Sequence, residues 1–76
     1  MDFDAAVPHA VQRAVALEAG REFCLKDLFE GVAWLDFSRG ERRQLGVRFK
    51  HEVTTGRVAT VVHVEGSHPA RYRKET

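Results

Sequence analysis

The chain of 76 residues contains one cysteine, two prolines and one residue each of tryptophan, tyrosine and methionine. A single cysteine excludes a disulfide framework, and Cys24, between Phe23 and Leu25, is predicted to be a buried structural thiol. Apolar stretches such as residues 31–35 are far shorter than the roughly 20 residues that a membrane-spanning helix needs. No signal-peptide pattern is present, so we expect an intracellular, cytoplasmic protein without a membrane partner.

Motifs for catalysis and metal binding are also missing. The four histidines (His9, His51, His63 and His68) show no H-x-x-x-H spacing, and Cys24 has no second cysteine, so no metal site is predicted. Neither a nucleophile elbow nor a glycine-rich phosphate loop occurs. A chain this short buries only about 60% of its unfolded surface, which leaves little room for a deep active site. We therefore expect neither enzymatic activity nor a cofactor.

The net charge of +1 conceals an asymmetry between the two halves of the chain. Residues 1–37 carry seven acidic and three basic side chains, a net −4, whereas residues 38–76 carry nine basic and four acidic side chains, a net +5. The basic residues fall on one predicted helix and one predicted hairpin. This distribution favours a polyanionic partner for the C-terminal half.

The strongest local signal predicts a helix over residues 39–55. Ser38 followed by Glu41 forms a capping box, and Gly56 is suited to end the helix. Leu45, Phe49 and Val53 are spaced at four, so they fall on one face. The opposite side carries Arg43, Gln44, Val47, Lys50, His51 and Thr54.

Two residues of this helix need a separate explanation. Gly46 lies in the helix interior, where glycine costs about 0.5–1 kcal/mol relative to alanine, so we expect a packing reason for it, such as close approach of the helix over residues 26–30. Arg42 lies near the apolar side, and we expect it to pair with Asp27 or Asp36 rather than to contact a ligand.

The remaining elements follow from composition and turn residues. We predict a loose leader over residues 1–6, a helix over 7–19, a short strand over 22–25, a short helix over 26–30, a strand over 57–64, a turn over 65–69 and a return strand over 70–74. Residues 30–37 either extend the short helix or form a loop. Val32 to Leu35 are expected to be largely buried, with Trp34 at the centre of the core beside Phe29, Leu35 and Phe49.

This order of elements predicts one α+β domain over residues 1–76. A three-helix core over residues 7–56 is followed by a C-terminal β-hairpin over residues 57–74. With the short strand, the hairpin completes a small antiparallel sheet. Three helices closed by such a sheet are typical of the winged helix-turn-helix fold, with the hairpin as its wing.

The chain also resembles small single-domain winged-helix proteins of bacteria and their phages, which include an uncharacterised family. The resemblance covers about residues 7–74. It is carried by residues 23–29, Trp34, Arg42, Leu45, Gly46, Phe49, Val53 and residues 72–74. It implies the winged-helix fold and a role in DNA binding, but winged helices also bind proteins, so it does not fix the function.

The first functional hypothesis is double-stranded DNA binding by a small transcriptional regulator. Helix 39–55 would enter the major groove, with Arg43 and Gln44 at base edges and Val47 and His51 on the same face. Arg39, Arg48 and Lys50 would contact phosphates, while His63, His68, Arg71 and Arg73 of the wing would reach the adjacent backbone or minor groove. A homodimer would enlarge the small interface of one domain, through the first helix or through an exposed Phe3.

The alternative hypothesis is a protein-binding module. Asp2, Asp4, Glu18, Glu22, Asp27 and Glu30 would present an acidic surface to a basic partner, as in a phage-type inhibitor of a host nucleic-acid-handling complex. A third interpretation, a fragment of a larger assembly, is disfavoured by the complete set of predicted elements.

Overall fold

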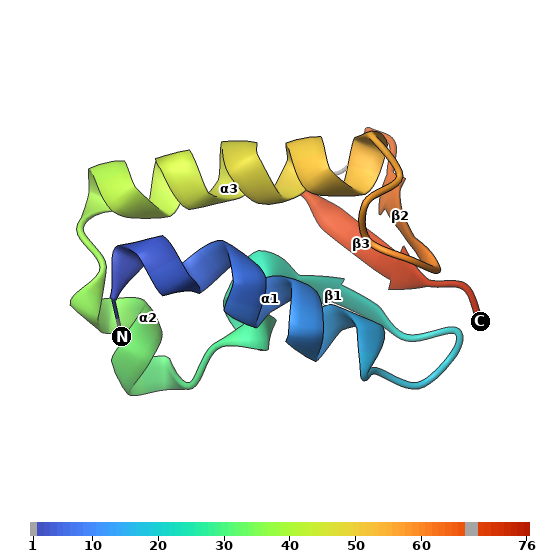
Figure 1. Ribbon diagram of the computed structural model, residues 1–76, viewed down its shortest axis with the longest axis horizontal. Helices are drawn as coiled ribbons and strands as arrows, with labels where there is room; N and C mark the ends of the chain where they lie inside the picture. The colour runs from blue at the N-terminus through green and yellow to red at the C-terminus, as the bar shows by residue number, and fades with distance from the viewer. Residues whose placement is uncertain (1, 67–68) are drawn as a thin grey trace.

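The computed structural model describes residues 2–66 and 69–76 (Figure 1). Within these residues the fold is α+β, with three α-helices and a three-stranded antiparallel sheet. The α-helices are α1 (Ala6–Val15), α2 (Gly31–Asp36) and α3 (Arg39–Thr54), and the strands are β1 (Glu22–Cys24), β2 (Val61–Val64) and β3 (Arg71–Lys74). Two 3-10 helices, η1 (Phe3–Ala5) and η2 (Leu25–Leu28), precede α1 and follow β1.

The strand β3 is the centre of the sheet, whose order is β1-β3-β2. Tyr72 of β3 is aligned with Phe23 of β1 on one side and with His63 of β2 on the other. Because side chains alternate between the faces of a strand, these three share the face that packs toward the helices. Arg71 and Arg73 therefore point to the opposite, outer face.

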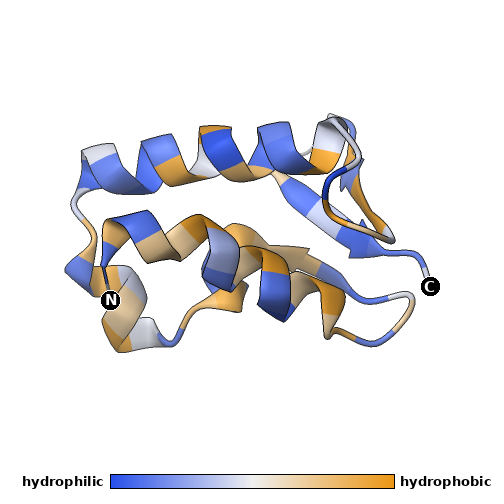
Figure 2. Cartoon of the chain, in the orientation of Figure 1, coloured by the Kyte–Doolittle hydropathy of each residue, from blue (hydrophilic) through white to orange (hydrophobic). Residues whose placement is uncertain are grey.

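The core lies between α1, α3 and the inner face of the sheet. α3 runs along one side of the molecule above α1, and the sheet closes one end (Figure 1). Ala6, Ala10 and Ala14 form the buried side of α1, and their small size lets α1 pack close to α3. The largest fully buried side chains are Phe23, Leu28, Leu45, Phe49 and Tyr72. α3 is mostly polar where it faces away from this core (Figure 2).

The N-terminal segment is more ordered than the sequence predicted. Instead of a loose leader over residues 1–6, η1 leads directly into α1, and Ala6 is completely buried. Phe3 is half-buried and makes an edge contact with Phe37, with ring centroids 6.1 Å apart, so the prediction of an exposed aromatic was wrong.

The first helix is also shorter than predicted, because α1 ends at Val15 rather than at residue 19. Gly20 has a φ of +87° and belongs to the turn that follows, where its amide donates a hydrogen bond to the Lys74 carbonyl at 2.6 Å. Gly20 thus connects the loop between α1 and β1 to β3 through this hydrogen bond, and it does not cap α1.

Residues 25–37 form two separate short elements. The predicted helix over residues 26–30 is the 3-10 helix η2, begun by a hydrogen bond from the Cys24 amide to Asp27 Oδ2 at 2.9 Å. The following stretch is neither an extension nor a loop but α2, in which Val32 is 75% and Leu35 is 72% exposed.

The prediction that these residues are buried, with Trp34 at the core centre, was wrong. Phe29 and Phe37, which flank α2, are buried, and Trp34 is half-buried against both of their rings. A six-residue helix at the end of the molecule has only one covered side, so its other apolar side chains face outward.

The C-terminal hairpin is shorter than predicted at its start. β2 covers only Val61–Val64, because Thr60 has a positive φ of +64°, which an extended strand does not allow. Val58 is buried and anchors the intervening turn. β3 matches the predicted return strand within one residue. His68, which the DNA hypothesis included, lies outside the described residues.

Candidate functional site

The helix α3 is fixed at both ends as the sequence predicted. The Glu41 amide donates a hydrogen bond to Ser38 Oγ at 3.1 Å, and the Ser38 amide donates to Glu41 Oε1 at 2.8 Å, which confirms the capping box. After the last helical residues, Gly56 takes the left-handed conformation that suits a glycine cap. Leu45, Phe49 and Val53 are buried, which confirms the apolar stripe and sets which side of α3 faces outward.

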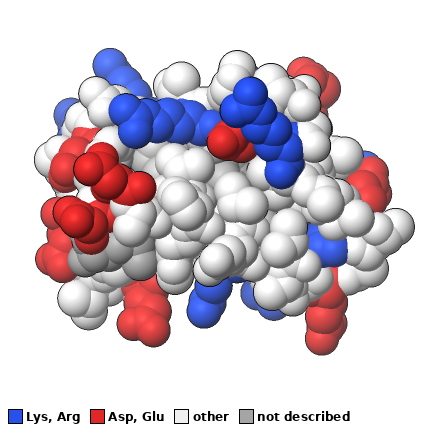
Figure 3. Space-filling model, viewed as in Figure 1, with Lys and Arg blue, Asp and Glu red and all other residues white. Residues whose placement is uncertain are grey.

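The predicted outward face is the one that the structure exposes. Every candidate residue of this helix is exposed: Arg39, Arg43, Gln44, Val47, Arg48, Lys50 and His51. Val47 is 67% exposed and is the one apolar member of this set. Basic side chains run along α3 at the top of Figure 3, whereas acidic side chains gather at the end that holds the N-terminus and α2.

Arg42 binds backbone carbonyls and not a carboxylate. Its Nε donates a hydrogen bond to the Trp34 carbonyl at 3.1 Å, and an Nη donates to the Leu35 carbonyl at 3.3 Å. The predicted pairing with Asp27 or Asp36 was therefore wrong. The last carbonyls of a helix lack partners in the regular helical pattern, and Arg42 donates to two of those of α2, although the Trp34 carbonyl also accepts from the Phe37 amide at 3.3 Å.

The basic residues of the hairpin have partners within the chain. Arg71 Nε lies 3.5 Å from Glu22 Oε1, and an Arg73 Nη lies 3.3 Å from Glu75 Oε1. The hydrogen bonds that Arg73 donates to the Glu75 carboxylate raise the pKa of the Arg73 guanidinium above its ordinary value. Both arginines lie on the outer face of the sheet and do not continue the outward face of α3.

His63, which was predicted to contact DNA from the wing, is largely buried in the structure. Its side chain is only 8% exposed, and its ring makes an edge contact with Tyr72 at 5.5 Å between centroids. Its Nδ1 lies 3.7 Å from Glu65 Oε1, beyond hydrogen-bond distance. His63 is thus a packing residue of the inner sheet face.

A groove of about 490 Å³ runs along one side of α3, between this helix, η2 and the start of β3. We call it the α3 groove. Its basic members among the described residues are Lys26, Arg42, Arg43 and Lys50, and none of the described residues that line it is a carboxylate. Its apolar members include Leu25, Trp34, Val47 and Ala70. Sequence reasoning missed both the groove and Lys26, because no local pattern shows that η2 faces α3.

Gly46 also lines this groove, and no helix approaches it. A Cβ built on Gly46 meets no atom within 4 Å, so the predicted close approach of the segment at residues 26–30 was wrong. The glycine leaves open space beside the backbone of α3.

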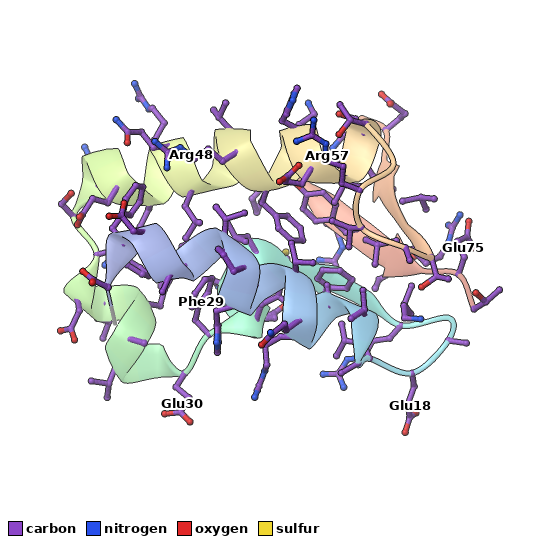
Figure 4. All side chains as sticks on the ribbon, in the orientation of Figure 1. Glu18, Phe29, Glu30, Arg48, Arg57 and Glu75 are labelled. Carbon is purple, nitrogen blue, oxygen red and sulfur yellow. The ribbon has the colours of Figure 1, made fainter. Side chains whose placement is uncertain are left out.

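A second groove lies on the other side of α3, and Val47 borders both. It combines Arg48 and Arg57 with the carboxylates of Asp4 and Glu52, and Arg57 pairs with Glu52 at 3.4 Å. The Arg48 guanidinium carbon lies 5.3 Å from the centre of the Phe3 ring, which positions it over the N-terminal segment. Figure 4 shows Arg48 and Arg57 along α3. The two grooves therefore differ in charge although they flank the same helix.

Cys24 and Tyr72 lie at the base of the α3 groove. Cys24 is half-buried rather than fully buried, and an Nη of Arg71 donates to its Sγ at 3.8 Å. Burial raises the pKa of the Tyr72 phenol to about 12, and the nearby Cys24 thiol adds to this effect.

The described residues hold no cluster of three or more His, Cys, Asp or Glu side chains placed to bind a metal ion. Over the same residues, the helices are too short and too polar for any of them to cross a membrane.

Comparisons with known proteins place the chain in a family but not in a functional class. No curated protein and no solved structure matches it. A family model does match, over residues 8–74, and this span contains α3, both strands of the hairpin and all but three of the residues that line the two grooves. The chain therefore belongs to the DUF1413 family, described as a domain of unknown function.

Proposed function

We propose that this protein is a winged helix that binds double-stranded DNA, as a small transcriptional regulator. The observation that carries the proposal is the outward face of α3, where Arg39, Arg43, Arg48 and Lys50 are exposed together with Gln44 and His51. None of these four cations has a carboxylate partner within 4 Å among residues 2–66 and 69–76. Such a surface has the charge and the hydrogen-bonding groups that DNA requires.

The order of the elements supports the winged-helix assignment. A helix, a strand, two helices and a hairpin follow one another, and the hairpin strand β3 pairs with both β1 and β2. In this arrangement α3 is the recognition helix, and β2 and β3 are the strands of the wing.

The exposed side chains of α3 fall into two groups, those that would contact base edges and those that would contact phosphates. An α-helix fits the major groove of B-DNA, and Arg43 and Gln44 lie on the outward side of its N-terminal half. Arginine recognises guanine and glutamine recognises adenine through pairs of hydrogen bonds. Arg39, Arg48 and Lys50 lie around them and would bind phosphates. Arg71 and Arg73 contribute only if DNA contact displaces Glu22 or Glu75 from them.

Fluorescence anisotropy with a duplex of mixed sequence tests the proposal. The purified protein is titrated at about 50 and 200 mM salt, and affinity should fall steeply with salt because phosphate contacts release counterions. The double variant Arg43→Glu, Lys50→Glu should abolish binding. A matched control, Arg13→Glu with Arg21→Glu, makes the same charge change at exposed residues outside both grooves and should retain most of the affinity. Absence of binding by the folded wild-type chain would refute the proposal.

A second candidate function, docking on a protein, has one observation in its favour. α2 exposes Val32 and Leu35, at the end of the molecule where acidic side chains gather (Figure 3). The acidic half does not form one surface, since Glu18 and Glu30 lie toward opposite ends of the molecule (Figure 4). Glu22 and Asp27 already bind Arg71 and the Cys24 amide.

Two double variants separate the second candidate from DNA binding in a pull-down from host extract. A protein partner on this end should be lost with Val32→Asp, Leu35→Asp and retained with Arg43→Glu, Lys50→Glu. If Val32 and Leu35 also form a homodimer interface, analytical ultracentrifugation of the pure protein should show a dimer. The double variant Val32→Asp, Leu35→Asp should then be monomeric.

A further inference from the structure

We propose that one sugar–phosphate strand of the bound duplex lies in the α3 groove, passing over Gly46 between Lys26 of η2 and the α3 cations Arg43 and Lys50. This inference rests on the proposed DNA binding. It adds Lys26 as a DNA contact outside α3 and the hairpin. It also requires that residue 46 of α3 carry no side chain.

Gly46 is the first line of argument. It lies in the interior of a 16-residue helix, where glycine is less favourable than alanine. Its φ is not positive, and no neighbouring atom would obstruct a Cβ. The fold alone therefore gives no reason for glycine at this position. Because Gly46 lines the α3 groove, its missing side chain leaves the helix backbone open to a ligand in that groove.

The charges of the groove identify the ligand as a polyanion. The described residues that line it include four cations and no carboxylate, and Arg42 is already bound to the Trp34 and Leu35 carbonyls. The other three, Lys26, Arg43 and Lys50, have no ion-pair partner among the described residues. The second groove contains two carboxylates, which would repel phosphates. A phosphate strand is therefore favoured in the α3 groove over the second groove.

Shape and apolar character favour a sugar–phosphate strand over a free phosphate. When a helix lies in the major groove, the two backbone ridges of DNA run along its sides, and a groove beside the helix receives one of them. The walls between the cations are apolar, with Leu25, Val47 and Ala70 available to the C–H edges of the sugars. Lys26 and Lys50 then meet the phosphates on either side of those sugars, while Arg43 extends from the same groove to a base edge.

Gly46→Ala tests the steric requirement, with Gly31→Ala in α2 as the control, since neither added Cβ meets an atom within 4 Å and Gly31 lines neither groove. Gly46→Ala should raise the midpoint of thermal unfolding by roughly 2–8 °C, because helix propensity improves. It should nevertheless weaken duplex binding several-fold in the anisotropy assay. Gly31→Ala should leave duplex binding unchanged. A variant that is more stable and binds less tightly cannot be explained by damage to the fold.

Lys26→Gln tests the charge contact independently. Loss of one phosphate contact should reduce the slope of log affinity against log salt by about 0.9. Arg13→Gln removes one positive charge outside both grooves and should leave the slope close to that of the wild type.

The outcomes separate the two proposals. If the wild-type chain binds no duplex, the proposed function fails and this inference fails with it. If the wild-type chain binds, but Gly46→Ala keeps its affinity or Lys26→Gln keeps its salt slope, DNA binding stands and the groove contact is overturned.

Discussion

Arg42 of α3 holds the end of α2 through Trp34. Its Nε donates to the Trp34 carbonyl at 3.1 Å, and its guanidinium carbon lies 5.6 Å from the centre of the Trp34 ring. One side chain thus satisfies a terminal carbonyl of α2 and covers the aromatic ring of the same residue. Because α2 is only six residues long, this link fixes its position against α3.

Replacing Arg42 should therefore loosen α2. We expect Arg42→Met to keep the packing of the aliphatic part of the side chain. It should lower the free energy of unfolding by about 1–2 kcal/mol, because two helix-terminal carbonyls lose a charged donor. Denaturant unfolding followed by the fluorescence of Trp34, the one tryptophan of the chain, measures the change. Arg43→Met is the matched control at an exposed neighbour and should change stability by less than about 0.5 kcal/mol. Equal stability of both variants would contradict this role for Arg42.

The capping box should have a measurable effect on the start of α3. Ser38→Ala removes the acceptor of the Glu41 amide and should cost about 0.5–2 kcal/mol of stability. Glu41→Gln keeps an oxygen that can accept from the Ser38 amide, so it should cost much less. Thermal unfolding followed by circular dichroism compares the two. A larger loss for Glu41→Gln than for Ser38→Ala would show that charge at the helix start matters more than the hydrogen bond.

Local signals were sufficient to predict α3. Its cap, its apolar stripe and its outward face all follow from spacing within one segment, and the structure agrees with each. The strands of the hairpin were placed for a related reason, since β-branched residues and a turn identify them without long-range information.

The predictions failed where the result depends on what another element covers. Leu35 and Val32 are as apolar as core residues, and only the position of α2 at the end of the fold exposes them. The face of a strand on which His63 lies depends on register, which the sequence of one strand does not fix. Lys26 joins the α3 groove only because the fold places η2 across that groove from α3, so no spacing within residues 25–28 predicts it.

The exposed position of Leu35 gives a direct test of the corrected core. We expect Leu35→Gln to change the free energy of unfolding by less than about 0.5 kcal/mol, because the side chain is already in solvent. Leu45→Ala, which truncates a completely buried leucine of α3, should cost about 2–5 kcal/mol. Urea unfolding of both variants measures the contrast. A large loss for Leu35→Gln would mean that α2 buries this side chain, as the sequence alone suggested.

The raised pKa of Tyr72 predicts a loss of stability at high pH. The phenol of the unfolded chain loses its proton near its ordinary pKa of 10.0, whereas burial in the folded chain raises that pKa to about 12. Between these values the unfolded state binds fewer protons than the folded state, so stability falls as pH rises. A difference of about two in pKa corresponds to about 2–3 kcal/mol, lost progressively from pH 10 to pH 12.

Tyrosinate absorbance follows this titration directly, because Tyr72 is the single tyrosine of the chain. In the native protein the absorbance should rise well above pH 10, whereas in denaturant it should rise near pH 10. Tyr72→Phe keeps the ring that stacks on Phe23 and meets the edge of Phe49, so it separates the phenol from the packing. Its unfolding midpoint should decline less steeply above pH 10 than that of the wild type. Identical declines would assign the alkaline loss of stability to the lysines and arginines instead, and would remove the phenol from the explanation.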